Sequence, residues 1–196
     1  PVLEEFQTNL KTGQDDGVQF AAYVRGKCVV DLAGSVVSSA DPNDRLRRYA
    51  EDSYTCCYSS SKVVESAVVA WLVDQGRINY DTKIRDVWPE FTGGGKERLS
   101  LADLMKHEAG MKQVPCHDPV PLEELLPENI KAGYVSRRIE GWECKYPNNE
   151  PKSKREYHAL TRGMIANEIV RRVDLKGRTM GAILREAFTE PLGIDK

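Results

Sequence analysis

A serine and a lysine stand three residues apart at the start of an apolar stretch of the chain. The segment YSSSKVVESAVVAWLVDQG contains Ser59 and Lys62, and the residues from Val63 to Val73 are apolar on nearly every side. A helix of this kind is normally buried all round, and a lysine beside it costs free energy unless its amine finds partners or gives up its proton. Residues three apart share one face of a helix. The Lys62 amine can therefore reach the Ser59 hydroxyl.

This spacing is typical of an activated nucleophile. Burial lowers the pKa of a lysine, and a neutral amine can take the proton of a serine hydroxyl that attacks a carbonyl. The N-terminal end of the helix would add backbone N–H groups near Ser59 for a developing oxyanion. In the alternative interpretation, Ser59, Ser60 and Ser61 cap the helix and Lys62 is an exposed charge. A chance S-x-x-K match occurs about once in a chain of this length, so the spacing alone leaves both interpretations open.

Elements that could position this pair are visible elsewhere in the sequence. Residues 3–10 predict a short helix that ends near Gly13, and VQFAAYVRGKCVVDLAG predicts two strands joined around Gly26. Ser100 and Asp103 have the spacing of a capping box at the start of a second helix. Strands come first and helices after, which favours an α+β or helix-rich α/β fold. Further helices are predicted within 156–173 and over 179–188.

The regular pattern degrades between residues 114 and 156, where Pro and Gly interrupt it repeatedly. We expect a long excursion with little regular structure, and loops of that length are often functional. Trp142 and Tyr146 could wall a pocket there or anchor the loop. Two basic runs are typical of solvated loop faces, and the second could guide an anionic substrate; they are Arg45-Arg47-Arg48 and Lys152-Lys154-Arg155.

The composition narrows the classes of partner. Of the 196 residues, 40% are hydrophobic and 30% charged, and the formal net charge is −2. These values argue against disorder and against a nucleic-acid partner held by bulk charge. No apolar run approaches the roughly 20 residues that span a bilayer. Because the chain begins at Pro1 rather than Met, we expect a processed chain or a fragment, and a lost targeting segment remains open.

The cysteines predict the redox environment. Their number is odd and no CxxC spacing occurs, which favours buried thiols in a reducing compartment over a disulfide framework. A cytoplasmic or organellar location is therefore favoured over secretion. Cys56 and Cys57, which precede the serine run, are expected to be buried packing residues just ahead of the nucleophile. The five are Cys28, Cys56, Cys57, Cys116 and Cys144.

Other candidate residues receive structural interpretations. His107, His117 and His158 do not have the spacing of a zinc site, and we expect no metal. No G-x-S-x-G elbow is present, which argues against an α/β-hydrolase triad. We expect His107 to pack at a helix end, where a cation is favoured, and His158 could tune its neighbour Tyr157. The segment GGGK at 93–96 lacks the frame of a phosphate loop and is predicted to be a flexible turn.

Five stretches follow one another in the order of a known family: GVQFAAYVRGKCVVDLAG, YSSSKVVESAVVAWLVDQGRINYDTKIRDVWPEF, LSLADLMKHEAGM, EYHALTRGMIANEIVRRV and FTEPLGI. They resemble serine β-lactamase-related proteins, above all the class C-like esterases and the animal β-lactamase-like proteins. The match covers nearly the whole chain except 114–156. The resemblance implies a β-lactamase/transpeptidase-like fold, with an antiparallel sheet flanked by helices and a helical subdomain.

Carried over to matching positions, the resemblance implies a catalytic group. Ser59 would be the acylated nucleophile, Lys62 the base or proton relay, and Tyr157 the tyrosine of the second motif that shares proton transfer with Lys62. The main-chain N–H of Ser59 would form half of an oxyanion hole. Tyr58, His158 and Ala159 would contact a small-molecule ester or amide substrate. No cofactor would be required.

Two departures from the family pattern shape the functional hypothesis. The second motif of true β-lactamases is Tyr-x-Asn, whereas Ala159 takes the place of the asparagine here, which favours an esterase-like acyl substrate over an antibiotic. No Lys-Thr-Gly or His-x-Gly triplet follows Tyr157. We therefore expect the front part of a longer domain, inactive alone and without the C-terminal strands, with helix and hairpin over 1–52 and a helical region over 53–196. The alternative is a non-catalytic scaffold for binding or self-assembly into a homo-oligomer.

Overall fold

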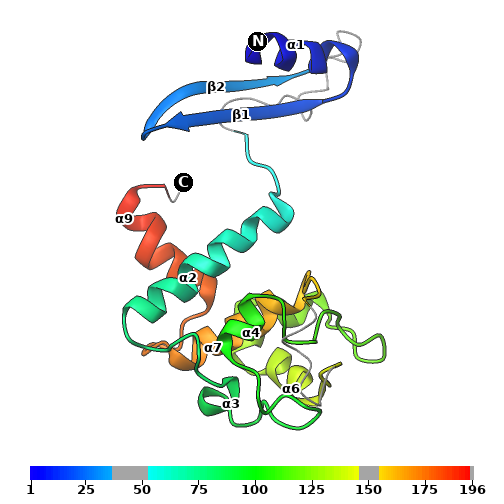
Figure 1. The fold of residues 1–196 in the computed structure, drawn as a ribbon, viewed down its shortest axis with the longest axis vertical. Coiled ribbons are helices and arrows are strands. Elements are labelled where there is room, and N and C mark those ends of the chain that lie inside the picture. The colour runs from blue at the N-terminus through cyan, green and yellow to red at the C-terminus, as the bar shows by residue number, and fades with distance from the viewer. Residues whose placement is uncertain (37–52, 146–154, 195–196) are drawn as a thin grey trace. The chain divides into compact units, whose positions relative to one another are not determined.

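The computed structural model describes residues 1–36, 53–145 and 155–194. They form two compact units, Pro1–Cys56 and Cys57–Lys196. The described part of the first unit contains one helix and two strands, and that of the second is helical (Figure 1). Some residues that the sequence singles out lie outside the described residues; they are Arg45, Arg47, Arg48, Tyr146, Lys152 and Lys154.

The first unit is a helix packed on a β-hairpin, which confirms the prediction for this region. Its elements are α1 (Val2–Thr12), β1 (Gly17–Val24) and β2 (Lys27–Ser35). Helix α1 ends at Gly13, whose φ of 73° lies in the left-handed region that glycine adopts without steric cost. The strands pair antiparallel around Arg25 and Gly26. The helix lies close to β2, because a Cβ added to Gly34 would be 2.9 Å from Leu10 Cδ1.

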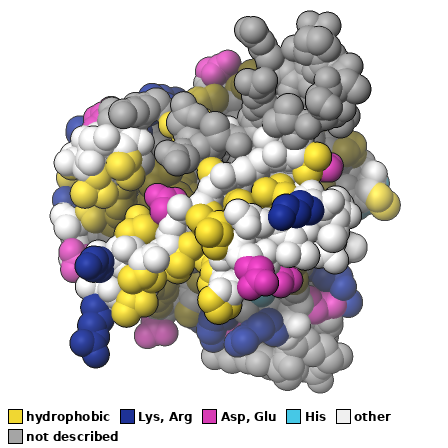
Figure 2. Space-filling model, turned by 90° about the horizontal axis from the view of Figure 1, so that it is seen from above, with side chains coloured by type: hydrophobic (Ala, Val, Ile, Leu, Met, Phe, Trp, Pro, Cys, Tyr) yellow, Lys and Arg dark blue, Asp and Glu magenta, His cyan; other side chains and the backbone are white. Residues whose placement is uncertain are grey.

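The hairpin carries exposed apolar side chains. Phe20, Tyr23, Val24 and Val29 are each largely exposed. Figure 2 shows hydrophobic side chains lying among basic and acidic ones on the face seen from above. No described side chain of α1, β1 or β2 is fully buried. A two-stranded hairpin of this kind needs further packing for independent stability.

The second unit has one hydrophobic core, to which helices α2 (Lys62–Asp74) and α7 (Thr161–Val173) contribute most. The two helices are about a hundred residues apart in sequence, and they pack against each other. Figure 1 shows α2 lying above α7. Their fully buried apolar residues recur at helical spacing; they are Val68, Val69 and Leu72 on α2, and Ile165, Ala166, Ile169 and Val170 on α7. Packing along these apolar faces positions the N-terminal ends of both helices.

Shorter elements complete the second unit. Helix α4 begins with the predicted capping box, since Ser100 Oγ accepts from Asp103 N–H and the Asp103 carboxylate accepts from Ser100 N–H. No helix in the described part of the chain is long and apolar enough to cross a bilayer. The remaining elements are η2 (Tyr58–Ser61), α3 (Ile84–Val87), α4 (Leu101–Met105), η3 (Leu122–Leu125), α5 (Pro127–Lys131), α6 (Tyr134–Gly141), α8 (Met180–Leu184), the π-helical turn η5 (Arg185–Thr189) and α9 (Glu190–Leu192).

The prediction of little regular structure between residues 114 and 156 is wrong for the described part of that segment. The segment contains the turn η3 and helices α5 and α6, and α6 buries Val135 and Ile139 in the core. Trp142 follows α6, is buried, and donates its indole N–H to Asp118 Oδ2 at 3.0 Å. Trp142 therefore anchors the segment. Helices this short contain too few turns for a period to stand out among the Pro and Gly residues.

The prediction of buried thiols is also wrong for most of the cysteines. Cysteine is often buried in folded proteins, but this tendency is statistical and does not fix a single position. Cys144 is buried, with its Sγ 3.2 Å from the Ala109 carbonyl. The other four are exposed, including the two ahead of the serine run; they are Cys28, Cys56, Cys57 and Cys116.

The segment GGGK at 93–96 forms the predicted turn, with Lys96 N–H donating to the Gly93 carbonyl at 3.2 Å, but the lysine side chain is packed in the interior. Lys96 is 1% exposed, and burial lowers its pKa. Its Nζ donates to three carbonyls at the end of α6: Ile139 at 3.1 Å, Glu140 at 2.6 Å and Trp142 at 2.6 Å. The last carbonyls of a helix have no intrahelical donor, and a cation is favoured beside them. Lys96 therefore stabilises the C-terminal end of α6.

Replacing this lysine tests its structural role. We expect Lys96→Met to lower the free energy of unfolding by about 3 kcal/mol, because buried carbonyls lose a charged donor. Lys83→Met is a matched control, since Lys83 Nζ donates to one exposed carbonyl, that of Arg98, at 2.7 Å. Chemical denaturation of both variants gives the comparison. Equal losses would show that the buried contacts of Lys96 contribute nothing special.

Candidate active site

Three side chains singled out in the sequence lie together at the N-terminal end of α2. The Tyr157 hydroxyl is 2.5 Å from Ser59 Oγ, and Lys62 Nζ is 3.5 Å from the same oxygen. Lys62 Nζ also lies over the Tyr157 ring, 5.2 Å from its centroid. The serine hydroxyl therefore has a phenol and an amine within hydrogen-bond reach. Such a group can move a proton away from an attacking serine.

The backbone turns sharply just before Ser59. Tyr58 is exposed and has φ 44°, a left-handed conformation that costs a non-glycine residue about 1–2 kcal/mol. The turn is held by two bonds, from Ser61 Oγ to the Tyr58 carbonyl and from Ser60 N–H to the Cys57 carbonyl at 3.0 Å. Strain of this kind clusters at functional sites. The N–H of Ser59 lies in the first turn of η2, where helical N–H groups have no intrahelical partner.

Helix α2 is less buried than its composition predicts. Its middle turns face the core, but Val63 in the first turn is 70% exposed. Lys62 is only partly buried, and its Nζ donates to the Ala159 carbonyl at 2.7 Å. The expectation of a helix buried all round is therefore wrong for this end. Polar partners, more than burial, fix the position of the amine.

The groups around Tyr157 favour its ionised form, which can accept a proton. Its hydrogen bond with Ser59, followed by the hydrogen bond and charge of Lys62, lowers the pKa of the Tyr157 hydroxyl. Both neighbours stabilise the phenolate more than the phenol. Because Tyr157 is 53% exposed, solvent screens part of this effect.

His158 lies in the interior, next to the exposed Tyr157. It is 0% exposed; its Nδ1 is 2.6 Å from the Glu156 carbonyl, and its Nε2 accepts from Met111 N–H at 3.0 Å. Nδ1 must donate and Nε2 must accept, so the ring is neutral, and burial lowers its pKa. The expectation that the His158 side chain contacts substrate is contradicted by this burial. Instead, His158 anchors the segment that carries Tyr157.

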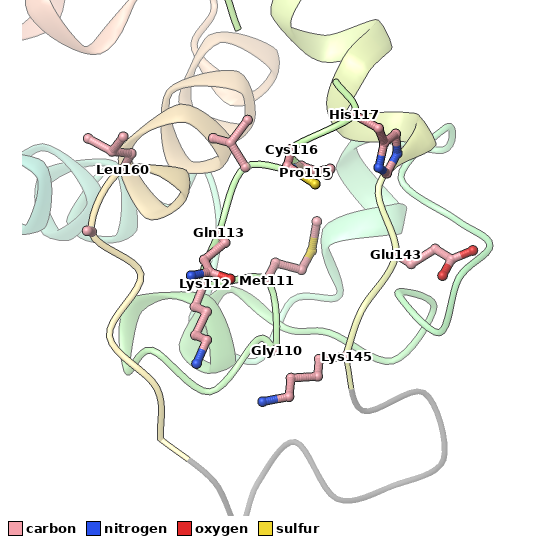
Figure 3. A pocket seen from close by; sticks show the side chains of 12 residues that line it. Gly110, Met111, Lys112, Gln113, Pro115, Cys116, His117, Glu143, Lys145 and Leu160 are labelled. Atoms are coloured by element: carbon pink, nitrogen blue, oxygen red, sulfur yellow. The ribbon is translucent and has the colours of Figure 1, made fainter. Parts of the chain in front are cut away.

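A pocket of about 770 Å³ opens beside Ala159. Figure 3 shows residues 110–117 running through it, with Leu160 on one side and Glu143 on the other. The wall combines apolar side chains with lysines whose charges are partly neutralised by one carboxylate, since Lys112 and Lys145 both pair with Glu156. Ala159 lines the pocket and also binds the Lys62 amine through its carbonyl. The pocket therefore adjoins the group formed by Ser59, Lys62 and Tyr157.

His107 packs at the end of the α4 segment, as expected, but not as a cation. It has φ 65°, and its ring centroid is 5.0 Å from that of Tyr157. Its Nδ1 accepts from His158 N–H at 3.0 Å. Burial, followed by the charge of Arg162, lowers the pKa of His107 to about 4. The expected cation at this helix end is supplied by Arg162, whose Nη1 is 3.4 Å from the Met105 carbonyl.

Two residues near the site were missed in the sequence. Arg162 and Glu65 form an ion pair, with Arg162 Nε 2.9 Å from Glu65 Oε2 and both side chains largely buried. The available signal was that Glu65 interrupts the apolar helix α2, where a charge requires a partner. The partner lies 97 positions away, and no local pattern assigns a pair so distant.

The fold is β-lactamase/transpeptidase-like, with helices and a small antiparallel sheet. The sequence model of the family described as Beta-lactamase matches residues 5–196. The chain belongs to the β-lactamase family. This confirms the resemblance and the fold class expected from the five motif stretches.

Individual relatives agree with this assignment. The chain is 31% identical over 200 residues to the esterase/beta-lactamase LipL of Mycobacterium tuberculosis, covering 99% of this chain and 41% of that protein. The structure of a penicillin-binding protein homologue from Caulobacter crescentus is similar with TM-score 0.78 and 35% identity, covering 98% of this chain and 48% of that one. A family VIII carboxylesterase gives TM-score 0.77 and 31% identity, with 98% and 48% coverage. The chain thus spans less than half the length of each relative.

The neutral state of His107 predicts an acid-sensitive contribution to stability. Since its pKa is about 4 when folded and 6.5 ordinarily, this contribution is fully present above pH 6.5 and is lost as pH falls toward 4. His107→Asn keeps an acceptor near the Nδ1 position and suits the positive φ. Between pH 6.5 and 4 the free energy of unfolding should fall in wild type because His107 resists protonation. The variant lacks this group, so its fall should be smaller by up to about 3 kcal/mol. Urea titrations at several pH values measure it, and identical pH dependence would contradict the assignment.

Proposed function

We propose that the protein containing this chain is a serine hydrolase that forms an acyl-enzyme at Ser59. The observation that carries the proposal is the 2.5 Å contact between the Ser59 and Tyr157 hydroxyls, with the Lys62 amine 3.5 Å from the same serine oxygen. A serine hydroxyl alone is a weak nucleophile and needs a base within hydrogen-bond reach. The family membership and the esterase and carboxylesterase relatives support the same reaction class.

Proton transfer in this mechanism runs through Tyr157. In its phenolate form Tyr157 accepts the Ser59 proton while Oγ attacks the carbonyl carbon of the substrate. The charge of Lys62 stabilises that phenolate, since the amine lies over the ring. Tyr157 then gives the proton to the leaving oxygen or nitrogen as the bond from the carbonyl carbon breaks. Tyr157 then takes a proton from water, whose oxygen attacks the acyl carbon. As the bond from that carbon to Ser59 Oγ breaks, Tyr157 gives the proton to Oγ, and the acyl group leaves as a carboxylic acid.

The oxyanion would receive one hydrogen bond from the Ser59 N–H. This group lies in the first turn of η2, which continues directly into α2, so the helix dipole adds to its positive character. Donors of this type act on the charge that develops in the transition state, and each contributes strongly to the rate. The left-handed backbone of Tyr58 directs the chain into this turn.

The substrate is inferred to be a small ester or amide rather than a lactam antibiotic. Ala159 stands where the β-lactamase motif has an asparagine, and its backbone carbonyl, not a side-chain amide, holds the Lys62 amine. No amide side chain is therefore offered to a lactam from this position. The adjoining pocket has apolar walls at Met111, Val114 and Leu160, which suit the hydrocarbon part of an acyl or alcohol group.

Covalent labelling tests the nucleophile. We expect a fluorophosphonate probe to label the complete gene product at Ser59, and Ser59→Ala to abolish both labelling and ester turnover. Lys62→Ala and Tyr157→Phe should each lower the labelling rate by on the order of 10²-fold or more, because the first removes the charge that stabilises the base and the second removes the base itself. Mass spectrometry of the labelled peptide identifies the modified residue.

The neighbouring serine provides the matched control for that experiment. Ser60 is exposed and lies in the same serine run, so Ser60→Ala should label normally. Labelling that persists in Ser59→Ala would exclude Ser59 as the nucleophile. An unlabelled wild-type protein that still binds partners or self-assembles would favour the non-catalytic scaffold.

Ester chain length tests the pocket. Leu160 is exposed and lines the pocket, so Leu160→Ala should fold normally while removing apolar contact with a bound chain. We expect kcat/KM for a hexanoate ester, relative to an acetate ester, to fall about tenfold. Leu122→Ala is the control, since Leu122 is a still more exposed leucine in η3 that does not line the pocket. An unchanged ratio in Leu160→Ala would place the substrate chain elsewhere.

A further inference from the structure

A buried guanidinium lies directly beneath the candidate site. Arg162, in the first turn of α7, is 6% exposed, and its Nε is 2.9 Å from Glu65 Oε2 on α2. A charge so buried is costly unless it is paired and hydrogen-bonded. The mechanism proposed above does not use either residue. The position and partners of Arg162 therefore need a separate explanation.

Arg162 binds the backbone of Lys62, the residue whose charge stabilises the Tyr157 phenolate in the proposed mechanism. Its Nη2 donates to the Lys62 carbonyl at 3.0 Å, and its Nη1 lies 3.4 Å from the Met105 carbonyl at the end of α4. The planar fork of an arginine presents donors on three nitrogens and can hold acceptors that lie on different elements, whereas a lysine ammonium donates from a single point. Through Glu65 and Lys62 the side chain grips the first turn of α2 at two points. It also joins that turn to α4 and α7.

The same guanidinium reaches the tyrosine side of the site. Arg162 Nη1 lies 3.4 Å from His107 Nε2, and the His107 ring packs 5.0 Å from the Tyr157 ring. Because Nδ1 of the neutral ring is the acceptor, Nε2 carries the proton, and Arg162 supports His107 by packing rather than by a hydrogen bond. His107 Nδ1 accepts from the N–H of His158, the residue after Tyr157. One side chain is thus hydrogen-bonded to the backbone of Lys62 and packs against His107, which in turn contacts the ring of Tyr157 and the backbone next to it.

We propose that Arg162, paired with Glu65, is the positioning residue that sets the Lys62 amine and the Tyr157 hydroxyl against Ser59. The inference rests on the proposed function, since it concerns the same site. Arg162 contacts none of the reacting atoms and acts through the residues it holds. Small displacements of a catalytic group can cost on the order of 10²-fold in rate.

The charge of Arg162 also enters the electrostatics of the phenol. The pKa of Tyr157 is lowered first by the hydrogen bond with Ser59, then by Lys62, and further by Arg162. Loss of a positive charge should therefore raise this pKa and move the acid limb of the rate profile to higher pH. The charged and titratable groups around this site are Lys62 and Glu65 on α2, His107 after α4, Glu156 and His158 beside Tyr157, and Arg162 on α7.

Glycine next to Arg162 makes room for this ion pair. A Cβ added to Gly163 would lie 2.8 Å from Glu65 Oε1, closer than real contacts allow. Glu65 could avoid the clash only by moving, and the bond to Arg162 opposes that movement. Gly163→Ala therefore displaces the pair without changing any charge. Gly181→Ala, on helix α8, is its control, because a Cβ there meets nothing within 4 Å.

The experiment measures the rate of Ser59 labelling against pH in the complete gene product. We expect Arg162→Met to lower the plateau rate by on the order of 10²-fold and to shift the acid limb to higher pH. Arg162→Lys keeps the charge but not the fork, so it should lower the plateau while leaving the limb near its wild-type position. Arg171→Met is the matched control: it removes the same charge from α7, where Arg171 pairs with Glu168, and should change neither value.

A second readout keeps the inference separate from the proposed function. The ionisation of Tyr157 can be followed by NMR of tyrosine labelled at Cζ, with Tyr157→Phe to assign the signal. If wild type is not labelled at Ser59, the proposed function fails, while a higher Tyr157 pKa in Arg162→Met still supports the inference. Folded Arg162→Met and Gly163→Ala that match wild type in rate, pH profile and Tyr157 titration would overturn it.

Discussion

The hydrogen bond between Ser59 and Tyr157 is the contact on which the candidate site depends. It joins residues 98 positions apart, so it exists only when the N-terminal ends of α2 and α7 are brought together. The packing of α2 against α7, whose shared core includes Val68 and Leu72, holds these helix ends next to each other. Burial of such side chains stabilises a fold by roughly 1.5–3 kcal/mol each, whereas the site itself is exposed and strained. The core therefore supports a geometry that the site residues could not hold alone.

Buried polar contacts refine this arrangement. The ion pair of Arg162 and Glu65 joins α7 to α2. His158 anchors the segment ahead of α7, and Lys96 binds the last carbonyls of α6. Each of these groups is hydrogen-bonded, as a low-dielectric interior requires. Apolar packing tolerates many arrangements of similar energy, while a buried charge with specific acceptors tolerates few. These contacts accordingly specify where the helix ends lie more sharply than hydrophobic burial does.

The sequence predicted much of the fold. A local pattern predicted each of four features: the α1 helix, the hairpin, the capping box at Ser100 and the helix α7. Their order along the chain, taken together, indicated the family. The sequence failed at the short helices of 114–145 and at the exposed cysteines, and it did not indicate that Lys96 is buried. In each case the deciding partner is remote in sequence: α6 needs Lys96, and Lys96 needs the carbonyls of α6. Composition and spacing contain no information about such pairs.

By itself the sequence determined which side chains could do chemistry: a serine and a lysine on one helical face, and a tyrosine before another helix. These choices depend on side-chain type and helical period, both of which are local. Only the tertiary structure decided that His158 points inward while Tyr157 points outward, that His107 is neutral, and that Arg162 lies beneath the site. Orientation, protonation and charge pairing depend on distance and dielectric surroundings, which exist only after the chain has folded.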